Sequence, residues 1–243
     1  MRLRRVAAPL LLPAALLAAT AAPPAAAPDE RRIMLTGYER IRVDGPFKVR
    51  VIGDGPPSAT ISGERRAIDR ISVRNQGGTL IVGIAATTWD GWREKEGTAI
   101  VTLSARGLRA ANVNGGGALE IDAMRGQRID LGVNGSGSLA IGRIEADQLV
   151  TTLTGTGAVK IAGGSARNAR FSNFGAGSID AGAMPANDLW VNSQSAGDSS
   201  FAARFTAEVT VLGTGKVIVA GNATCRLAGP GPAACAGKTE RRR

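Results

Sequence analysis

The chain has 243 residues, of which 44% are hydrophobic and 21% are charged, so it is long enough for one or two globular domains and too apolar for a disordered polymer. It contains no histidine, which excludes catalytic triads with an imidazole base and zinc sites with histidine ligands. The formal charge is +10, and the 33 glycines show no three-residue period, which excludes collagen. Aromatic residues make up only 4%, which predicts an aliphatic core.

The first 27 residues have the pattern of a secretory signal peptide. A basic start, residues 2–5, precedes an alanine- and leucine-rich run that ends near residue 22 in small residues. A membrane-spanning helix needs about 20 apolar residues, whereas this run is shorter and contains Pro13. Because no cysteine lies near the expected cleavage site, we expect no lipid anchor. The sequence predicts a signal peptide over 1–27, a linker over 28–32 and export to the periplasm or the extracellular space.

Cys225 and Cys235 are the two cysteines of the chain. In an exported protein, this close spacing predicts an intramolecular disulfide that closes a short loop. Half of a metal site is the alternative, and the lack of histidine weakens it.

The C-terminal residues 238–243 are mostly basic. Such a cluster can contact anionic lipids, polyanionic sugars or nucleic acid. No aromatic residues are interleaved with the charges for stacking on bases, so we expect no nucleic-acid partner and favour a disordered, solvated tail.

Pairs of glycines separated by one residue recur at a fixed interval in the second half of the chain. Four successive pairs begin at positions 115, 135, 155 and 175, a step of twenty residues, and a later pair begins at 213. An interval this regular is typical of a repeat architecture. Glycine suits such bends because they stack directly on one another, where a Cβ would obstruct the backbone. The predicted structural bends are Gly115, Gly117, Gly135, Gly137, Gly155, Gly157, Gly175, Gly177, Gly213 and Gly215.

Apolar residues alternate with polar ones on both sides of each glycine pair. Around the second pair, Leu131 and Val133 precede the bend and Leu139 and Ile141 follow it, a period of two that indicates strands with one buried face. Equivalent positions that stack about 4.8 Å apart form a parallel β-helix with an aliphatic ladder inside. A β-sandwich is the alternative, but its strands do not require a fixed interval.

We therefore predict an all-β fold, a single-domain right-handed parallel β-helix (solenoid) with about twenty residues per rung and stacked Gly-x-Gly bends. Apolar residues around Gly45 and Gly77 approximate the same offsets less regularly. The sequence thus predicts a domain over 33–237, with irregular N-terminal rungs over 33–105 and regular rungs over 106–237.

A charged excursion within the irregular N-terminal rungs contains Trp89 and Trp92. Paired tryptophans on a loop can stack on sugar rings or dock a partner, so both are candidate ligand contacts. The alternative, which we favour, is that they fold back over the open end of the ladder.

The strongest enzymatic alternative is a carbohydrate-active β-helix, a polysaccharide hydrolase or lyase. Its chemistry needs two carboxylates about 5–10 Å apart. Asp147 and Asp188, two rungs apart in neighbouring columns, are the best pair that the repeat provides, and they are more simply interpreted as exposed corner charges. We predict no catalytic residue and no enzymatic activity.

The repeat also argues against a bound metal or cofactor. Calcium-binding solenoids repeat acidic residues in each turn, whereas Ala118, Ser138, Ala158 and Ser178 follow the bends here. A dinucleotide fingerprint opens a helix, whereas each Gly-x-Gly here precedes a strand pattern. We expect no metal site and no cofactor.

Three features together resemble a known family. They are the opening segment 38–49, the glycine pairs at intervals of twenty, and the closing segment with Cys225 and Cys235. They resemble the exported bacterial family called "putative auto-transporter adhesin, head GIN domain" over about residues 33–237. The resemblance implies a β-helical architecture without established enzymatic activity. In the fourth and fifth repeats, Asn173, Phe174 and Asp198 depart from the pattern and predict a local distortion there.

The sequence therefore predicts a non-enzymatic exported envelope protein that serves as an adhesion-like or binding module with a rigid β-helical surface. Its candidate partners are a polysaccharide or an envelope protein, and the ends of the ladder are candidates for self-association.

Overall fold

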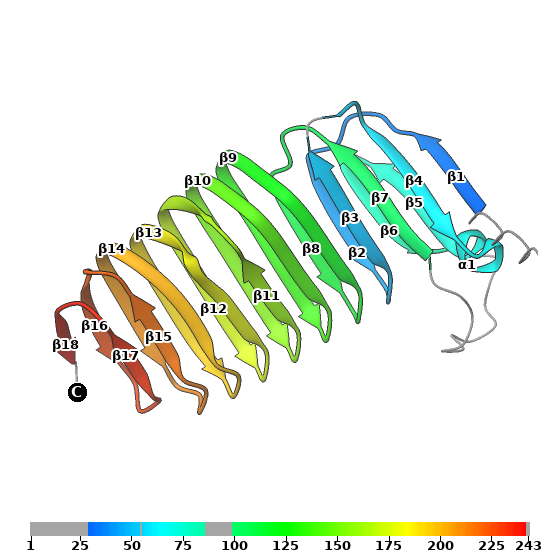
Figure 1. Cartoon of the computed structure of the whole chain (residues 1–243). Helices are drawn as coiled ribbons and strands as arrows, with labels where there is room; N and C mark the ends of the chain where they lie inside the picture. Colours follow the sequence, from blue (N-terminus) through cyan, green and yellow to red (C-terminus); the bar gives the residue numbers. More distant parts are fainter. Residues whose placement is uncertain (1–28, 54, 86–98, 242–243) are drawn as a thin grey trace, which may run out of the picture.

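One turn of the regular fold, or rung, takes twenty residues. The structure, a computed structural model, describes residues 29–53, 55–85 and 99–241 (Figure 1). Parallel pairing sets Leu119 opposite Leu139 and Val133 opposite Leu153, and the next rungs keep the same register. The predicted β-helix is therefore confirmed as a single-domain β-solenoid. The regular strands are β8 (Ala110–Asn114), β9 (Ala118–Gly135), β10 (Ser138–Gly155), β11 (Ala158–Ile161), β12 (Gly164–Gly175) and β13 (Ser178–Ser195).

Rungs become shorter toward the C-terminus. Ile179 pairs with Ser199, Ser199 with Val217, and Val217 with Ala233, so the register falls from twenty to eighteen to sixteen residues. Irregular pairing of β13 near Pro185 starts this change. The shorter rungs consist of β14 (Ser199–Val211), β15 (Val217–Ala220), β16 (Thr224–Ala228), β17 (Ala233–Cys235) and β18 (Thr239–Arg241).

The expected distortion is absent at Asn173 and Phe174, which keep the regular register, and is found further along, where the pairing of β13 with β14 shifts between Ala181 and Asp188. Asn173 is buried, and its side-chain amide donates a 2.9 Å hydrogen bond to the carbonyl oxygen of Gly177. The buried Ser195 hydroxyl donates to the same oxygen at 2.8 Å. The bend thus supplies an acceptor for these two buried donors, while Oδ1 of Asn173 has no hydrogen-bond partner.

Both ends of the domain extend beyond their predicted bounds. Strand β1 (Asp29–Met34) takes up most of the expected linker over 28–32 and pairs antiparallel with β4 (Ser58–Gly63). Strand β18 lies where the expected tail over 238–243 begins, and it pairs in parallel with β16. Both expectations are therefore wrong for the residues described. An open sheet edge offers backbone hydrogen bonds to any extended segment, even one whose side chains show no strand pattern.

The N-terminal part is a mixed cap rather than a series of loose rungs. One true rung, formed by β2 (Arg40–Asp44) and β3 (Lys48–Gly53), bends at Gly45 and lies between β8–β9 and the pair β6–β7. The expected rung around Gly77 is wrong, because β5 and β6 are antiparallel and Gly77 and Gly78 form their turn with φ of 56° and 74°. The other cap elements are α1 (Arg65–Asp69), β5 (Ile71–Gln76), β6 (Thr79–Ile84) and β7 (Ala99–Ala105).

The opening segment of the family pattern anchors this cap to the core. Tyr38 is buried, and its hydroxyl donates a 2.9 Å hydrogen bond to the carbonyl oxygen of Ser104 in β7. Burial raises the pKa of Tyr38, so the phenol stays protonated and keeps its role as a donor. The cap therefore shares one continuous hydrophobic core with the rungs.

Glycine is required at the bends for two separate reasons. In the four pairs at intervals of twenty, the first glycine has positive φ, as at Gly135 with 117°. The second lies against the rung before it, so a Cβ on Gly137 would lie 2.6 Å from the carbonyl oxygen of Gly117 and 2.7 Å from Val113 Cγ1. The middle position is open, because a Cβ on Gly116 would meet its nearest atom, Ser136 Oγ, at 3.5 Å.

We expect Gly137→Ala to destabilise the protein by about 1–3 kcal/mol, because the new methyl group overlaps backbone that cannot move without disturbing the stack. Gly116→Ala is the matched control in the same row of bends, and it should change the free energy of unfolding by less than about 0.5 kcal/mol. Denaturant unfolding of both variants measures the difference. Equal stability of the two variants would contradict this account of the bends.

The predicted disulfide between Cys225 and Cys235 is present. Cys225 is fully buried in β16 and Cys235 lies in β17, so the bond joins two strands of the shortest rungs, with their Cα atoms 6.5 Å apart. These rungs have few aliphatic residues to bury. The crosslink therefore stabilises the end of the ladder where packing contributes least.

Removing this bond with the double substitution Cys225→Ala and Cys235→Ala should lower the stability of the last rungs by about 2–3 kcal/mol, the entropy expected for so short a loop. Hydrogen exchange should accelerate in β16, β17 and β18 and stay unchanged in β9 and β10. Reduction of the native protein provides the comparison, and uniform acceleration along the whole ladder would refute a local role.

Candidate functional site

The carboxylates of the best predicted acid pair each have another partner. Asp147 lies 3.4 Å from Nε of Arg167, and Asp188 accepts a 2.6 Å hydrogen bond from the Thr206 hydroxyl. Both carboxylates are exposed, whereas a general acid at neutral pH needs a desolvated environment. This geometry favours the interpretation of Asp147 and Asp188 as surface charges.

A ladder of charges runs along the corner near Asp147. Glu145 accepts a 2.8 Å hydrogen bond from Nε of Arg143 and lies 3.3 Å from Nε of Arg125 on the preceding rung. The hydrogen bond from Arg143 and the charge of Arg125 lower the pKa of Glu145. The ionised carboxylate is therefore favoured in the folded protein, and it contributes stability that is lost as the pH falls through the lowered pKa.

The carboxyl resonance of Glu145 should titrate below the usual glutamate range in an NMR pH titration, because the folded state holds its charged form. Arg143→Gln removes the largest cause and should return the midpoint toward the ordinary value, whereas Arg167→Gln, on the neighbouring ion pair, should leave it in place. A midpoint that Arg143→Gln does not move would show that the hydrogen bond has no effect on this titration.

Within the described part of the chain, no group of three or more acidic or cysteine side chains is placed to hold a metal ion. Over the same residues, none of the helices has the length and apolar character to cross a membrane. The predicted contacts Trp89 and Trp92 lie outside the described residues.

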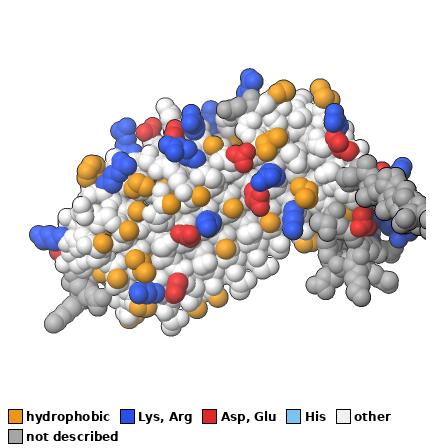
Figure 2. All heavy atoms as spheres, in the orientation of Figure 1, with side chains coloured by type: hydrophobic (Ala, Val, Ile, Leu, Met, Phe, Trp, Pro, Cys, Tyr) orange, Lys and Arg blue, Asp and Glu red, His pale blue; other side chains and the backbone are white. Residues whose placement is uncertain are grey.

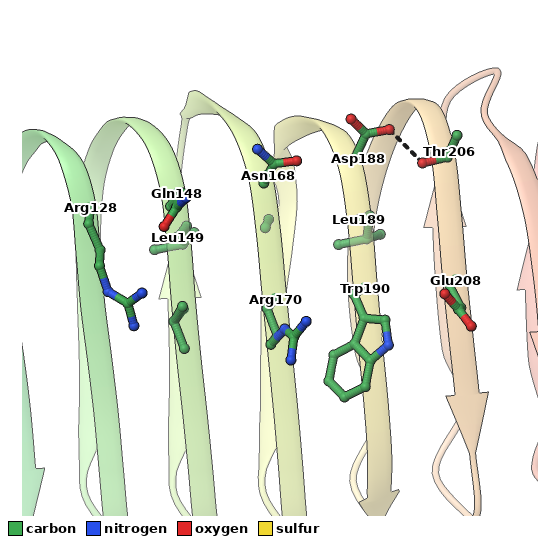
Figure 3. Close-up of a pocket in the computed structure, with 12 residues that line it drawn as sticks. Arg128, Gln148, Leu149, Asn168, Arg170, Asp188, Leu189, Trp190, Thr206 and Glu208 are labelled. Atoms are coloured by element: carbon green, nitrogen blue, oxygen red, sulfur yellow. Dashed lines mark hydrogen bonds between the residues drawn. The ribbon is translucent and has the colours of Figure 1, made fainter.

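A groove of about 670 Å³ lies on the outer face of the ladder, where β9, β10, β12, β13 and β14 run side by side (Figure 3). We call it the Trp190 groove. Along one side, a column of polar side chains takes one residue from each strand, and Figure 3 shows the hydrogen bond that links its last two members. This column consists of Arg128, Gln148, Asn168, Asp188 and Thr206.

The second column of the groove consists of Val150, Arg170, Trp190 and Glu208, which are also neighbours on successive strands. The Trp190 side chain points outward because Leu189 and Val191 on either side are buried in the core. Cζ of Arg170 lies 4.6 Å from the centroid of the Trp190 ring, a cation–π contact that fixes the orientation of the ring. The groove is therefore a flat aromatic platform beside a row of polar groups.

Charges of both signs occur on the same surface. Figure 2 shows Lys and Arg interspersed with Asp and Glu on the face in view. In the groove, the lining side chains with charge are Arg128, Arg170, Asp188 and Glu208, two of each sign, so the groove itself has no net charge.

Trp190 and Arg170 carry no sequence motif of their own, which is why the prediction passed over them. They become neighbours because twenty residues make one rung, so positions 150, 170 and 190 meet on adjacent strands. If the sequence is aligned in rows of twenty residues, Arg170 stands one row before Trp190 in the same outward-facing column. The sequence prediction instead singled out Trp89 and Trp92, which are three positions apart in the chain.

The family model described as "Putative auto-transporter adhesin, head GIN domain" matches residues 37–223. The chain belongs to this family. The match confirms the resemblance inferred from the glycine repeat and the opening segment. For this GIN-domain protein, no curated protein gives a significant match.

Solved structures share the fold of the GIN-domain protein. A "putative adhesin" from Bacteroides fragilis has a TM-score of 0.77 at 22% identity and covers 89% of this chain and 99% of its own. A "putative adhesin" from Parabacteroides distasonis has a TM-score of 0.66 at 18% identity, with 86% and 96% covered. A "putative lipid binding protein" from the same species has a TM-score of 0.55 at 17% identity, with 89% and 97% covered. At these low identities, the likeness shows the fold alone.

Proposed function

We propose that this GIN-domain protein is a non-enzymatic, exported, adhesion-like module that binds an envelope component through the outer face of its ladder. The observation that carries the proposal is the Trp190 groove, in which side chains from five successive strands form two regular columns on a rigid surface. Rigid platforms lose little conformational entropy when they bind, which suits an adhesive surface.

The partners of the acidic groups support a binding role over a catalytic one. Asp188 lines the groove but is held by the Thr206 hydroxyl, and Asp147 is held by Arg167 outside it. Glu208 is the other carboxylate that lines the groove, and it projects from the same face of the sheet as Asp188, one strand away and two residues along, so the two acids do not face each other across the groove. Glycoside cleavage needs such an opposed pair, so the groove is better suited to holding a ligand than to cleaving it.

The lipid-binding name of one solved structure fits this chain less well. A lipid tail needs an enclosed apolar cavity, whereas one continuous cluster of aliphatic side chains fills the interior of the ladder. The Trp190 groove is open and is bordered by charged and amide side chains. Its chemistry favours a polar ligand.

The test is a binding screen of the exported chain against three envelope fractions: purified peptidoglycan, lipopolysaccharide and capsular polysaccharide. We expect saturable binding to at least one fraction, with the ligand recovered at unchanged chain length by mass spectrometry. A ligand that becomes shorter, and stays intact with Asp147→Asn or Asp188→Asn, would show an enzyme instead. Lack of binding to all three fractions would also refute the proposal.

A further inference from the structure

We propose that the Trp190 groove binds an uncharged oligosaccharide, with the Trp190 ring as the stacking platform. This inference rests on the proposed binding function and names its ligand class and its site. It is argued from the half-buried aromatic ring on the outer face, the polar column, the charge balance and the dimensions of the groove.

The core of the ladder does not require a large aromatic side chain at Trp190. The core of the ladder is closed beneath it by Leu189 and Val191, so the indole adds nothing to the inner packing. A large aromatic side chain on the wet face of a sheet offers apolar area to a partner. The C–H groups on one face of a sugar ring form a flat, apolar surface. This surface packs well on an indole ring and poorly on a charged side chain.

Arg170 prepares this platform. Its guanidinium carbon lies 4.6 Å from the ring centroid, so the ring and the arginine restrain each other before any ligand arrives. A preorganised ring loses little side-chain entropy on binding. The N–H groups at the edge of the guanidinium can donate hydrogen bonds to the hydroxyl and ring oxygens of a sugar.

The polar column matches the hydroxyl groups of a sugar. Gln148 and Asn168 carry amides that both donate and accept hydrogen bonds, as hydroxyl groups do, and both side chains are exposed. Asp188 accepts from Thr206 through one oxygen and has further lone pairs for a ligand donor. In Figure 3 the row of Gln148, Asn168 and Asp188 lies next to the row that contains Trp190, two residues away along the strands. One ligand can therefore contact both columns.

The charge balance selects an uncharged ligand over a polyanion. Two arginines and two carboxylates line the groove. Arg128 is already engaged, because its guanidinium donates to both carboxylate oxygens of Asp130 at 2.9–3.1 Å. Glu208 and Asp188 would repel the carboxylates or sulfates of an acidic chain. The overall charge of +10 is therefore a poor guide to the groove.

The dimensions suit a chain of sugars rather than one. The groove spans five strands, from β9 to β14, and four strand spacings amount to about 19 Å. Its volume of about 670 Å³ lies inside the range usual for small-ligand sites. Both columns repeat at the strand spacing, so successive sugar units can meet successive rungs.

Isothermal titration calorimetry of the exported chain with four neutral hexasaccharides tests the proposal: cellohexaose, xylohexaose, maltohexaose and N-acetylchitohexaose. Hexagalacturonate serves as the acidic probe. We expect at least one neutral probe to bind and hexagalacturonate to bind more weakly. Trp190→Ala should weaken the neutral probe by about tenfold or more, the loss expected for one stacking contact in a preorganised site.

Two further variants make the result decisive. Trp190→Leu removes the aromatic ring but keeps apolar bulk, so it separates a loss of stacking from a loss of stability. It should lose affinity as Trp190→Ala does and should melt at the same temperature as the native protein. Ile218→Ala removes an exposed apolar side chain that does not line the groove and should change affinity by less than about twofold. Circular dichroism checks that each variant is folded.

Three outcomes would overturn the inference: no neutral probe binds, hexagalacturonate binds more tightly than all of them, or binding survives both Trp190 substitutions. If the native chain binds an envelope fraction and Trp190→Ala binds it equally well, the groove assignment fails while the proposed binding function stands. If the native chain binds no fraction, the proposed function itself fails.

Discussion

The close approach of backbone at the stacked bends is the constraint on which the structure depends. Gly137 has room for hydrogen alone, because the carbonyl oxygen of Gly117 would lie 2.6 Å from a Cβ. Similar close approaches recur at later bends, as at Gly157 against Gly137 and at Gly215 against Gly197, whether the rung has twenty or eighteen residues. Because the side-chain period of a strand is two, an error of one residue would move Leu139 and its equivalents from the core to the solvent. The bends thus protect the aliphatic ladder.

A fixed register turns linear spacing into surface chemistry. Residues twenty apart in the chain meet as neighbours on the sheet, so Arg170 contacts Trp190 and Asn168 lies opposite Asp188. One substitution at the same outward-facing position of each rung changes a whole column of side chains on the outer face and leaves the inner face unchanged. Solved structures at 18–22% identity share the fold, which is consistent with an outer face that can vary independently of the ladder.

The ends of the domain follow a different rule from its middle. Around Gly77 the apolar spacing resembles that of a rung, yet Gly77 and Gly78 both have positive φ and close an antiparallel hairpin. Residues 239–241 have no strand pattern, and they pair with β16 all the same. At both ends an unpaired sheet edge decides the outcome, because backbone hydrogen bonds to that edge are available whatever the side chains are. Local pattern is a poor predictor where tertiary pairing supplies the driving force.

The sequence by itself determined the ladder: glycine pairs at intervals of twenty, alternating aliphatic residues, one disulfide and the family were all readable, because each is a periodic or paired signal along the chain. Only the tertiary structure decided the candidate site. Trp190 and Arg170 are unremarkable where they stand in the chain, and Asp188, named from the sequence only as half of an acid pair, owes its partner Thr206 to a rung of eighteen residues instead of twenty. The side-chain contacts between neighbouring rungs depend on the local register of the strands. That register changes at the irregular pairing near Pro185, away from the residues that come into contact in the groove.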